Sequence, residues 1–304
     1  MTQQFQVAEE DAGVRLDKFL ASSFENLSRS YLQKLLKSGQ VLVGEKPAKA
    51  SYCVSEGEVI QIEVPEATEL EIEAEDLHLD ILYEDEDLIL INKPKGMVVH
   101  PAAGHYSGTL VNGLLWHCKG ELSGINGVLR PGIVHRIDMD TTGVLVACKT
   151  DFAHKSLAEQ LKVHSITRRY QAIVHGVIKE DEGTIDAPIG RHPVERKKMS
   201  INYNNGRSAV THYRVLRRFR QYTHVECQLE TGRTHQIRVH MAGIHHPLLG
   251  DTVYGPAKCP IANLTGQTLH AEVLGFVHPR TGQYLEVHAP LPEYFAQLLK
   301  ILPE

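Results

Sequence analysis

The sequence predicts an α+β protein, in which a small α/β unit precedes a larger unit built on an antiparallel sheet. Predicted strands outnumber predicted helices in the larger unit and do not alternate strictly with them, which argues against a doubly wound fold. An acidic segment at residues 65–80 separates two parts of ordinary composition. We therefore expect a first unit over residues 1–64, a linker over 65–80 and a second unit over 81–304.

The first unit is predicted to contain one helix and two strands. Three leucines, Leu32, Leu35 and Leu36, follow the spacing of an apolar helical stripe. The hydroxyl residues of segment 27–30 can cap the start of this helix, and Gly39 ends it. Strands are expected at residues 41–43 and 59–64, with a tight turn at Gly44-Glu45.

One face of this helix is basic and polar. Arg29, Gln33 and Lys37 recur every four residues, so they share a face away from the leucines. Such a face beside a small hairpin suits contact with an RNA backbone. A merely solvated helix face is the alternative.

The second unit is predicted to be rich in strands. Its strands are expected at residues 88–91, 132–134, 144–148, 170–175, 209–216 and 223–229. Its helices are expected at residues 109–118, 152–163 and 294–302.

Composition excludes several classes of protein. The hydrophobic fraction is 42% and the charged fraction 23%, with no apolar run long enough to span a membrane. The polar, acidic start does not resemble a secretory signal, so we expect a soluble, cytoplasmic protein. Five scattered cysteines form no Cys-x-x-Cys pair, which argues against a zinc site or a disulfide framework. The net charge is −5, but basic residues cluster at 29–49, 168–169, 191–198 and 214–220, where they can meet phosphate.

The densest group of reactive side chains is the segment His135-Arg136-Ile137-Asp138-Met139-Asp140, which lies between two predicted strands. An arginine can hold a nearby carboxylate ionised as a base or nucleophile. Taken alone, Asp138 and Asp140 could be glycosidase acids or metal ligands. They could also cap the loop through the threonines that follow. The spacing does not choose among these readings.

Segment 135–143 reads His-Arg-Ile-Asp-Met-Asp-Thr-Thr-Gly. Five further segments stand out along the chain: Asn92-Lys93-Pro94-Lys95-Gly96, Arg168-Arg169-Tyr170, Pro188-Ile189-Gly190-Arg191, Thr231-Gly232-Arg233-Thr234-His235-Gln236-Ile237-Arg238, and Pro247-Leu248-Leu249-Gly250-Asp251. In content and order these segments closely resemble the motifs of the large-subunit ribosomal RNA pseudouridine synthase family, the group that contains the A, C and D types, and the chain is most like the D type. The family pattern His-Arg-Leu-Asp-x-x-Thr-Ser-Gly is matched with Ile137 for Leu and Thr142 for Ser. The first unit resembles the small RNA-binding module of ribosomal proteins and of these enzymes.

The resemblance implies an α+β pseudouridine synthase domain and an isomerase that needs no cofactor and no metal. Asp138 would be the essential carboxylate and Arg238 its ion-pair partner. Tyr170 would be a catalytic residue that lies against the base and helps to remove the C5 proton, and Ile237 would pack on the uracil. Arg136 would take the place of the extruded uridine, at the cost of opening the stack. Asp140 is assigned no chemical step.

The resemblance also implies the partner. We expect a monomer that acts on structured RNA, large-subunit ribosomal RNA first, with Arg29 and Lys37 contacting RNA from the first unit. Three alternatives remain: transfer RNA as substrate, an inactive RNA-binding protein that acts in ribosome assembly, and a glycoside hydrolase.

Overall fold

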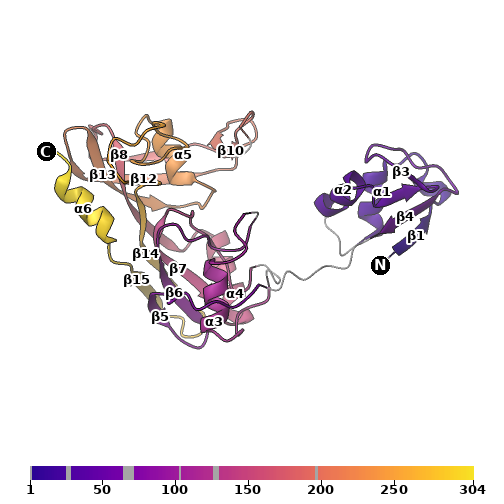
Figure 1. The fold of residues 1–304 in the computed structure, drawn as a ribbon, viewed down its shortest axis with the longest axis horizontal. Coiled ribbons are helices and arrows are strands. Elements are labelled where there is room, and N and C mark those ends of the chain that lie inside the picture. Colours follow the sequence, from indigo (N-terminus) through magenta and orange to yellow (C-terminus); the bar gives the residue numbers. More distant parts are fainter. Residues whose placement is uncertain (1, 25–28, 64–71, 103, 126–129, 196–197) are drawn as a thin grey trace. The chain divides into compact units, whose positions relative to one another are not determined.

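A computed structural model describes residues 2–24, 29–63, 72–102, 104–125, 130–195 and 198–304. The chain divides into two units, residues 1–69 and 70–304, and each is described by itself (Figure 1). The predicted α+β class is confirmed. None of the helices in the described ranges has the length and apolar character of a membrane span.

The first unit packs two helices on a four-stranded antiparallel sheet of order β1-β4-β2-β3. Its strands are β1 (Thr2–Gln6), β2 (Val41–Val43), β3 (Lys46–Pro47) and β4 (Val59–Glu63). Its helices are a 3-10 turn (Glu9–Asp11), α1 (Leu16–Ser23) and α2 (Arg29–Lys37).

The predicted helix of the first unit is α2, and its leucine stripe is buried against Leu16, Leu20 and Ile60. Gly39 has a φ of 76°, a left-handed conformation that suits glycine just after a helix. Gly44 and Glu45 both have positive φ, which gives the tight turn between β2 and β3. The predicted cap at Ser28 lies outside the described residues.

The second unit is built on a nine-stranded sheet of order β5-β6-β7-β14-β8-β13-β12-β9, with β15 paired to β14. The strands are β5 (Ile81–Glu84), β6 (Leu88–Lys93), β7 (Thr142–Cys148), β8 (Thr167–His175), β9 (Glu182–Asp186), β12 (Val210–Arg218), β13 (Tyr222–Leu229), β14 (Leu269–Val277) and β15 (Tyr284–His288). Strands β10 (Ile189–Arg191) and β11 (Met199–Ile201) form a separate hairpin. Strand β14 pairs in parallel with β7 and antiparallel with β8, so it joins the two halves of the sheet.

Four helices cover this sheet: α3 (Leu110–His117), α4 (Asp151–Lys162), α5 (Gln236–Gly243) and α6 (Glu293–Ile301). Helices α3 and α4 pack with β6 and β7 in the main core, whereas α6 packs beside β8 and β13 (Figure 1). Thr109 and Thr150 cap α3 and α4 by accepting backbone N–H bonds. The predicted helices at 109–118, 152–163 and 294–302 are confirmed.

One predicted strand is wrong. Residues 132–134 make only an isolated bridge, between Ile133 and Ala147. Pro131 has no N–H to donate, and Gly132 has a φ of 72°, so the ladder cannot extend here. The segment is therefore a loop that leads into the residues around Asp138.

The described part of the acidic segment, residues 72–80, belongs to the second unit. Ile72 packs on the main core, and Asn112 donates to the carbonyl of Glu73 at 2.8 Å. The backbone N–H of Glu75 returns a bond to the carbonyl of Asn112 at 3.0 Å. The domain bounds at residues 64 and 80 stay a prediction.

Candidate active site

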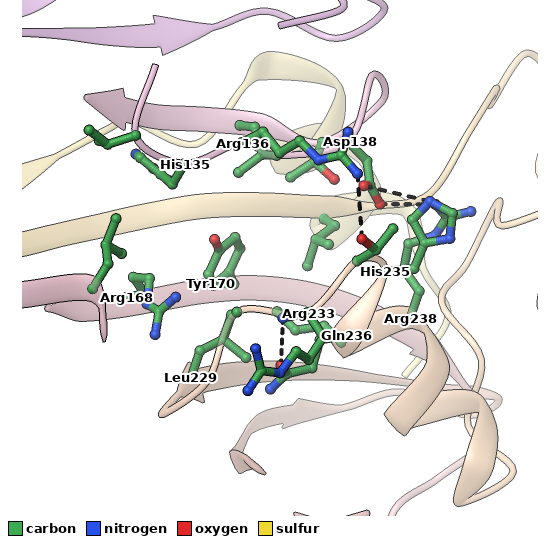
Figure 2. A pocket seen from close by; sticks show the side chains of 18 of the residues that line it. His135, Arg136, Asp138, Arg168, Tyr170, Leu229, Arg233, His235, Gln236 and Arg238 are labelled. Atoms are coloured by element: carbon green, nitrogen blue, oxygen red, sulfur yellow. Dashed lines mark hydrogen bonds and ion pairs between the residues drawn. The ribbon is translucent and has the colours of Figure 1, made fainter. Parts of the chain in front are cut away.

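The candidate site is a cavity of about 300 Å³ in the second unit, where β14 begins between β7 and β8. Its walls come from the loop of residues 134–138, from β8, and from the loop of residues 232–235 with the first turn of α5. Figure 2 shows Asp138, Arg136, His235 and Arg238 gathered at one end and Arg168 at the other, with Tyr170 between them. Segments more than 100 residues apart in the chain thus build one site.

Asp138 is held through one of its two carboxylate oxygens. Arg238 Nη1 donates to Asp138 Oδ2 at 2.9 Å. The other nitrogens of Arg238, Nε and Nη2, bind both oxygens of Asp251 at 2.7 and 3.0 Å. Asp251 also accepts the backbone N–H groups of Val253 and Tyr254, so it fixes the guanidinium that faces Asp138.

Charge favours this arrangement. Burial alone would lower the pKa of Arg238, but hydrogen bonds and charge from Asp251 and Asp138 raise it well above its usual value. Burial opposes the negative charge of Asp251 in the same way, and the Arg238 contacts nevertheless hold the pKa of that carboxyl below its usual range. Both groups are therefore charged near pH 7.

Lys93, at the end of β6, fixes the loop that carries Asp138. Its side chain is fully buried, and its Nζ donates to the backbone carbonyls of Pro94, Met97 and Met139 at 2.8–2.9 Å. Burial lowers the pKa of Lys93 to about 7, while the charges of Asp140 and Asp138 favour the ammonium. Three carbonyls also match the three donors of an ammonium. Lys93 thereby ties β6 to the residue that follows Asp138.

Tyr170 lies on β8 with only 8% of its surface exposed, and it lines the cavity. Burial raises the pKa of its phenol; Arg168 opposes this effect and Asp138 adds to it. The phenol therefore keeps its proton at neutral pH. Ile237, which is 3% exposed in the first turn of α5, gives the same cavity an apolar wall.

Three arginines give the cavity an excess of positive charge. Arg136 is exposed, and its Nη2 lies 3.4 Å from Thr234 Oγ1. Arg168 is 6% exposed and donates to the carbonyl of Glu230, and no described carboxylate forms an ion pair with it. Arg233 donates to the carbonyl of Ser208. A site of this kind suits a polyanionic substrate.

Asp140 does not join Asp138. It is absent from the cavity wall, and its carboxylate lies against Gly266, where a Cβ atom would collide with it. The side chain of Asp138 does not cap the loop either, because it turns to Arg238. The geometry therefore does not support a glycosidase pair. Among the described residues, no cluster of three or more His, Cys, Asp or Glu side chains could hold a metal ion.

Five of the predicted residues, Asp138, Tyr170, Arg238, Arg136 and Ile237, line this one cavity. Lys37 lies exposed on α2 of the first unit. The side chain of Arg29 lies outside the described part of the structure.

The sequence alone does not indicate a role in the site for five residues that the structure places there: His235, Asp251, Tyr254, Arg168 and Lys93. All of them except Tyr254 lie inside the motifs quoted above, and this position is the signal that the sequence offers for them.

Comparisons with known proteins agree with this geometry. Residues 87–243 match the RNA pseudouridylate synthase family, and residues 14–60 match the S4 domain. The uncharacterized RNA pseudouridine synthase YlyB of Bacillus subtilis is 55% identical over 295 residues, which are 97% of this chain and 96% of that protein. The ribosomal large subunit pseudouridine synthase D of Zymomonas mobilis is 47% identical over 310 residues, covering 99% of this chain and 98% of that one.

A solved structure is similar as well. Human RNA pseudouridylate synthase domain containing 1 superposes with a TM-score of 0.58 at 25% identity, over 74% of this chain and 96% of that one. Fold, motif order and near full-length relatives lead to the same conclusion: this chain belongs to the RNA pseudouridine synthase family.

Proposed function

We propose that this pseudouridine synthase isomerises specific uridines of large-subunit ribosomal RNA, with Asp138 as the reacting carboxylate. The observation that carries the proposal is the Asp138 carboxylate in a cavity beside Tyr170, ion-paired with Arg238 through one oxygen only. Several relatives named ribosomal large subunit pseudouridine synthase D support the choice of RNA.

The reaction needs a carboxylate and little else. It breaks the bond between ribose C1′ and uracil N1, turns the base, and joins C1′ to C5; the C5 proton leaves and N1 gains one. An ionised Asp138 can act as a nucleophile or take a ribose proton. Its Oδ1 atom makes no hydrogen bond to a described side chain and is available for either step. The protonated phenol of Tyr170 lies against the base and can donate to it.

Substrate entry uses the positive side chains. Arg136 at the mouth of the cavity fills the gap left by the extruded uridine, because a flat guanidinium can stack and bind phosphate at once. Ile237 packs on the face of the uracil. Arg168 and Arg233 attract the phosphates on either side of the extruded uridine.

Residues 1–64 would form an RNA-binding module that holds the substrate through Arg29 and Lys37, and residues 65–80 would tether it to a catalytic domain over 81–304. The match of residues 14–60 to the S4 domain supports the RNA-binding module. A ribosomal substrate in turn supports a cytoplasmic location. The expected monomer stays a prediction that light scattering can test.

The test is pseudouridine mapping of total RNA from cells that lack the gene and are rescued with three forms. Wild type and Asp186→Asn, a change at an exposed position on β9, should restore the same large-subunit sites. Asp138→Asn should restore none, although the protein accumulates. If pseudouridine returned only in transfer RNA, the substrate would be transfer RNA and not large-subunit ribosomal RNA. Sites that Asp138→Asn restores would overturn the role of Asp138.

A further inference from the structure

His235 is held beside Asp138 in an unusual backbone conformation. It precedes α5 with a φ of 56°, a left-handed value that a residue with a Cβ adopts at a cost of about 1 kcal/mol. The ring Nδ1 lies 2.7 Å from the hydroxyl of Tyr254. Nε2 lies 3.7 Å from Asp138 Oδ1 (Figure 2). The backbone thus directs the ring at the oxygen that Arg238 leaves free.

The hydrogen bonds at Tyr254 decide which ring nitrogen carries the proton. The backbone N–H of Met199 donates to the Tyr254 hydroxyl oxygen at 2.9 Å. The phenol has one proton of its own to place, and His235 Nδ1 is the acceptor that the described residues offer it. All three groups are satisfied when Tyr254 donates to Nδ1. Nδ1 is then bare, and the hydrogen of the neutral ring is on Nε2, facing Asp138.

This arrangement disfavours a charged ring. Protonation of Nδ1 would reverse this hydrogen bond, and the Tyr254 phenol would lose the acceptor that the described residues offer its proton. The charged groups around His235 are Asp138, Arg238, Asp251 and Arg136. Burial is the largest influence and lowers the pKa of His235, whereas the charge of Asp138 raises this pKa and the charge of Arg238 lowers it. An imidazolium would form an ion pair with Oδ1. Both oxygens of Asp138 would then be paired with cations, and neither would be free to react.

We propose that Tyr254 is a positioning residue of this synthase: its hydroxyl holds His235 in the neutral form with hydrogen on Nε2, which keeps Oδ1 of Asp138 free for the substrate. The inference rests on the proposed role of Asp138. At 3.7 Å the Nε2–H group is too far away to occupy Oδ1 with a hydrogen bond.

Tyr254→Phe tests this directly. The variant removes the hydroxyl but keeps the ring, which packs 5.1 Å from the Arg238 guanidinium. Tritium release from a large-subunit rRNA transcript labelled with [5-³H]uridine is measured between pH 5.5 and 8.5. The acid limb of kcat/KM should move up by about one pH unit in the variant, so that the loss is several-fold at pH 6, approaches about tenfold at lower pH and is small at pH 8. Tyr284→Phe, the same change on β15, should keep the wild-type profile.

Two further measurements separate positioning from a structural role. The double variant Tyr254→Phe/His235→Gln has no titrating ring, so its profile should lack the raised acid limb. In ¹⁵N-histidine NMR spectra, His235 should show the Nε2–H tautomer in wild type and a higher pKa in Tyr254→Phe. A loss that is equal at every pH, or an Nδ1–H tautomer in wild type, would overturn the inference. The spectra need no substrate, so they decide the matter even if wild type releases no tritium and the proposed function fails.

Discussion

Arg238→Met should reduce stability and activity by separate routes. The side chain of Asp251 is fully buried, and the substitution removes its counter-charge and two of its hydrogen bonds. Removing one partner of a buried ion pair costs about 3–5 kcal/mol. At ~2–4 °C per kcal/mol for a domain of this size, the melting temperature of the second unit should fall by roughly 6–20 °C.

A second substitution separates the two routes. Asp251→Asn in the same chain removes the unpaired charge and keeps a carbonyl oxygen for the N–H groups of Val253 and Tyr254. Most of the stability should therefore return. Activity should not, because Asp138 still lacks its 2.9 Å bond from Arg238. A hydrogen bond between charged groups contributes about 1.5–3 kcal/mol, which corresponds to roughly 10- to 150-fold in kcat/KM.

The assay is thermal unfolding followed by circular dichroism, together with tritium release from labelled rRNA at a temperature where all variants are folded. If the double variant regained activity along with stability, Arg238 would act on Asp138 only through the fold. If Arg238→Met melted like wild type, the buried pair would not contribute to stability as we reason.

Three further results are expected. Gly143→Ala should destabilise the second unit by more than ~3 kcal/mol in urea unfolding, because its φ is 107° and a Cβ would collide with the Ala271 carbonyl; Gly124→Ala, where the space is open, is the control, and equal stabilities would contradict this reasoning. Burial lowers the pKa of His224 from 6.5 to about 4. The unfolded chain therefore binds a proton in that window that the folded chain does not, and stability should fall as the pH drops from 6.5 to 4, by up to about 3 kcal/mol. Urea unfolding at pH 7 and 4.5 should show a smaller fall for His224→Gln, and identical falls would refute the assignment. Lys37→Ala should weaken RNA binding and reduce the slope of log affinity against log salt by about one, as measured by filter binding, and an unchanged slope would remove Lys37 from the interface.

Local patterns made much of the fold predictable. Helices α3 and α4 both follow a threonine cap, and α4 also buries a single face, so their residues alone indicate where they begin. Helix α5 has neither property: residues 236–241 are all buried, which leaves no apolar stripe, and no side chain caps its start. The sequence of residues 231–238 therefore indicates a motif but no helix.

The site was predictable only in part for a related reason. Motif resemblance named Asp138, Tyr170 and Arg238, and the structure brings them into one cavity. The residues that hold these side chains in place do so through contacts between distant segments of the chain, such as the hydrogen bond from Lys93 to the carbonyl of Met139. The periodicity of the sequence does not predict such contacts, because they form only when the sheet has brought distant segments together.

The position of β14 also fixes when the site can exist during synthesis. Strand β7, which follows Asp138, emerges from the ribosome more than 120 residues before the strand that pairs with it in parallel. Until residues 269–277 are made, the half-sheet that carries Asp138 and the half that carries Tyr170 have no strand between them. A nascent chain that stops short of β14 should therefore be unable to modify RNA, even though every residue of the cavity except Leu269 has already been translated.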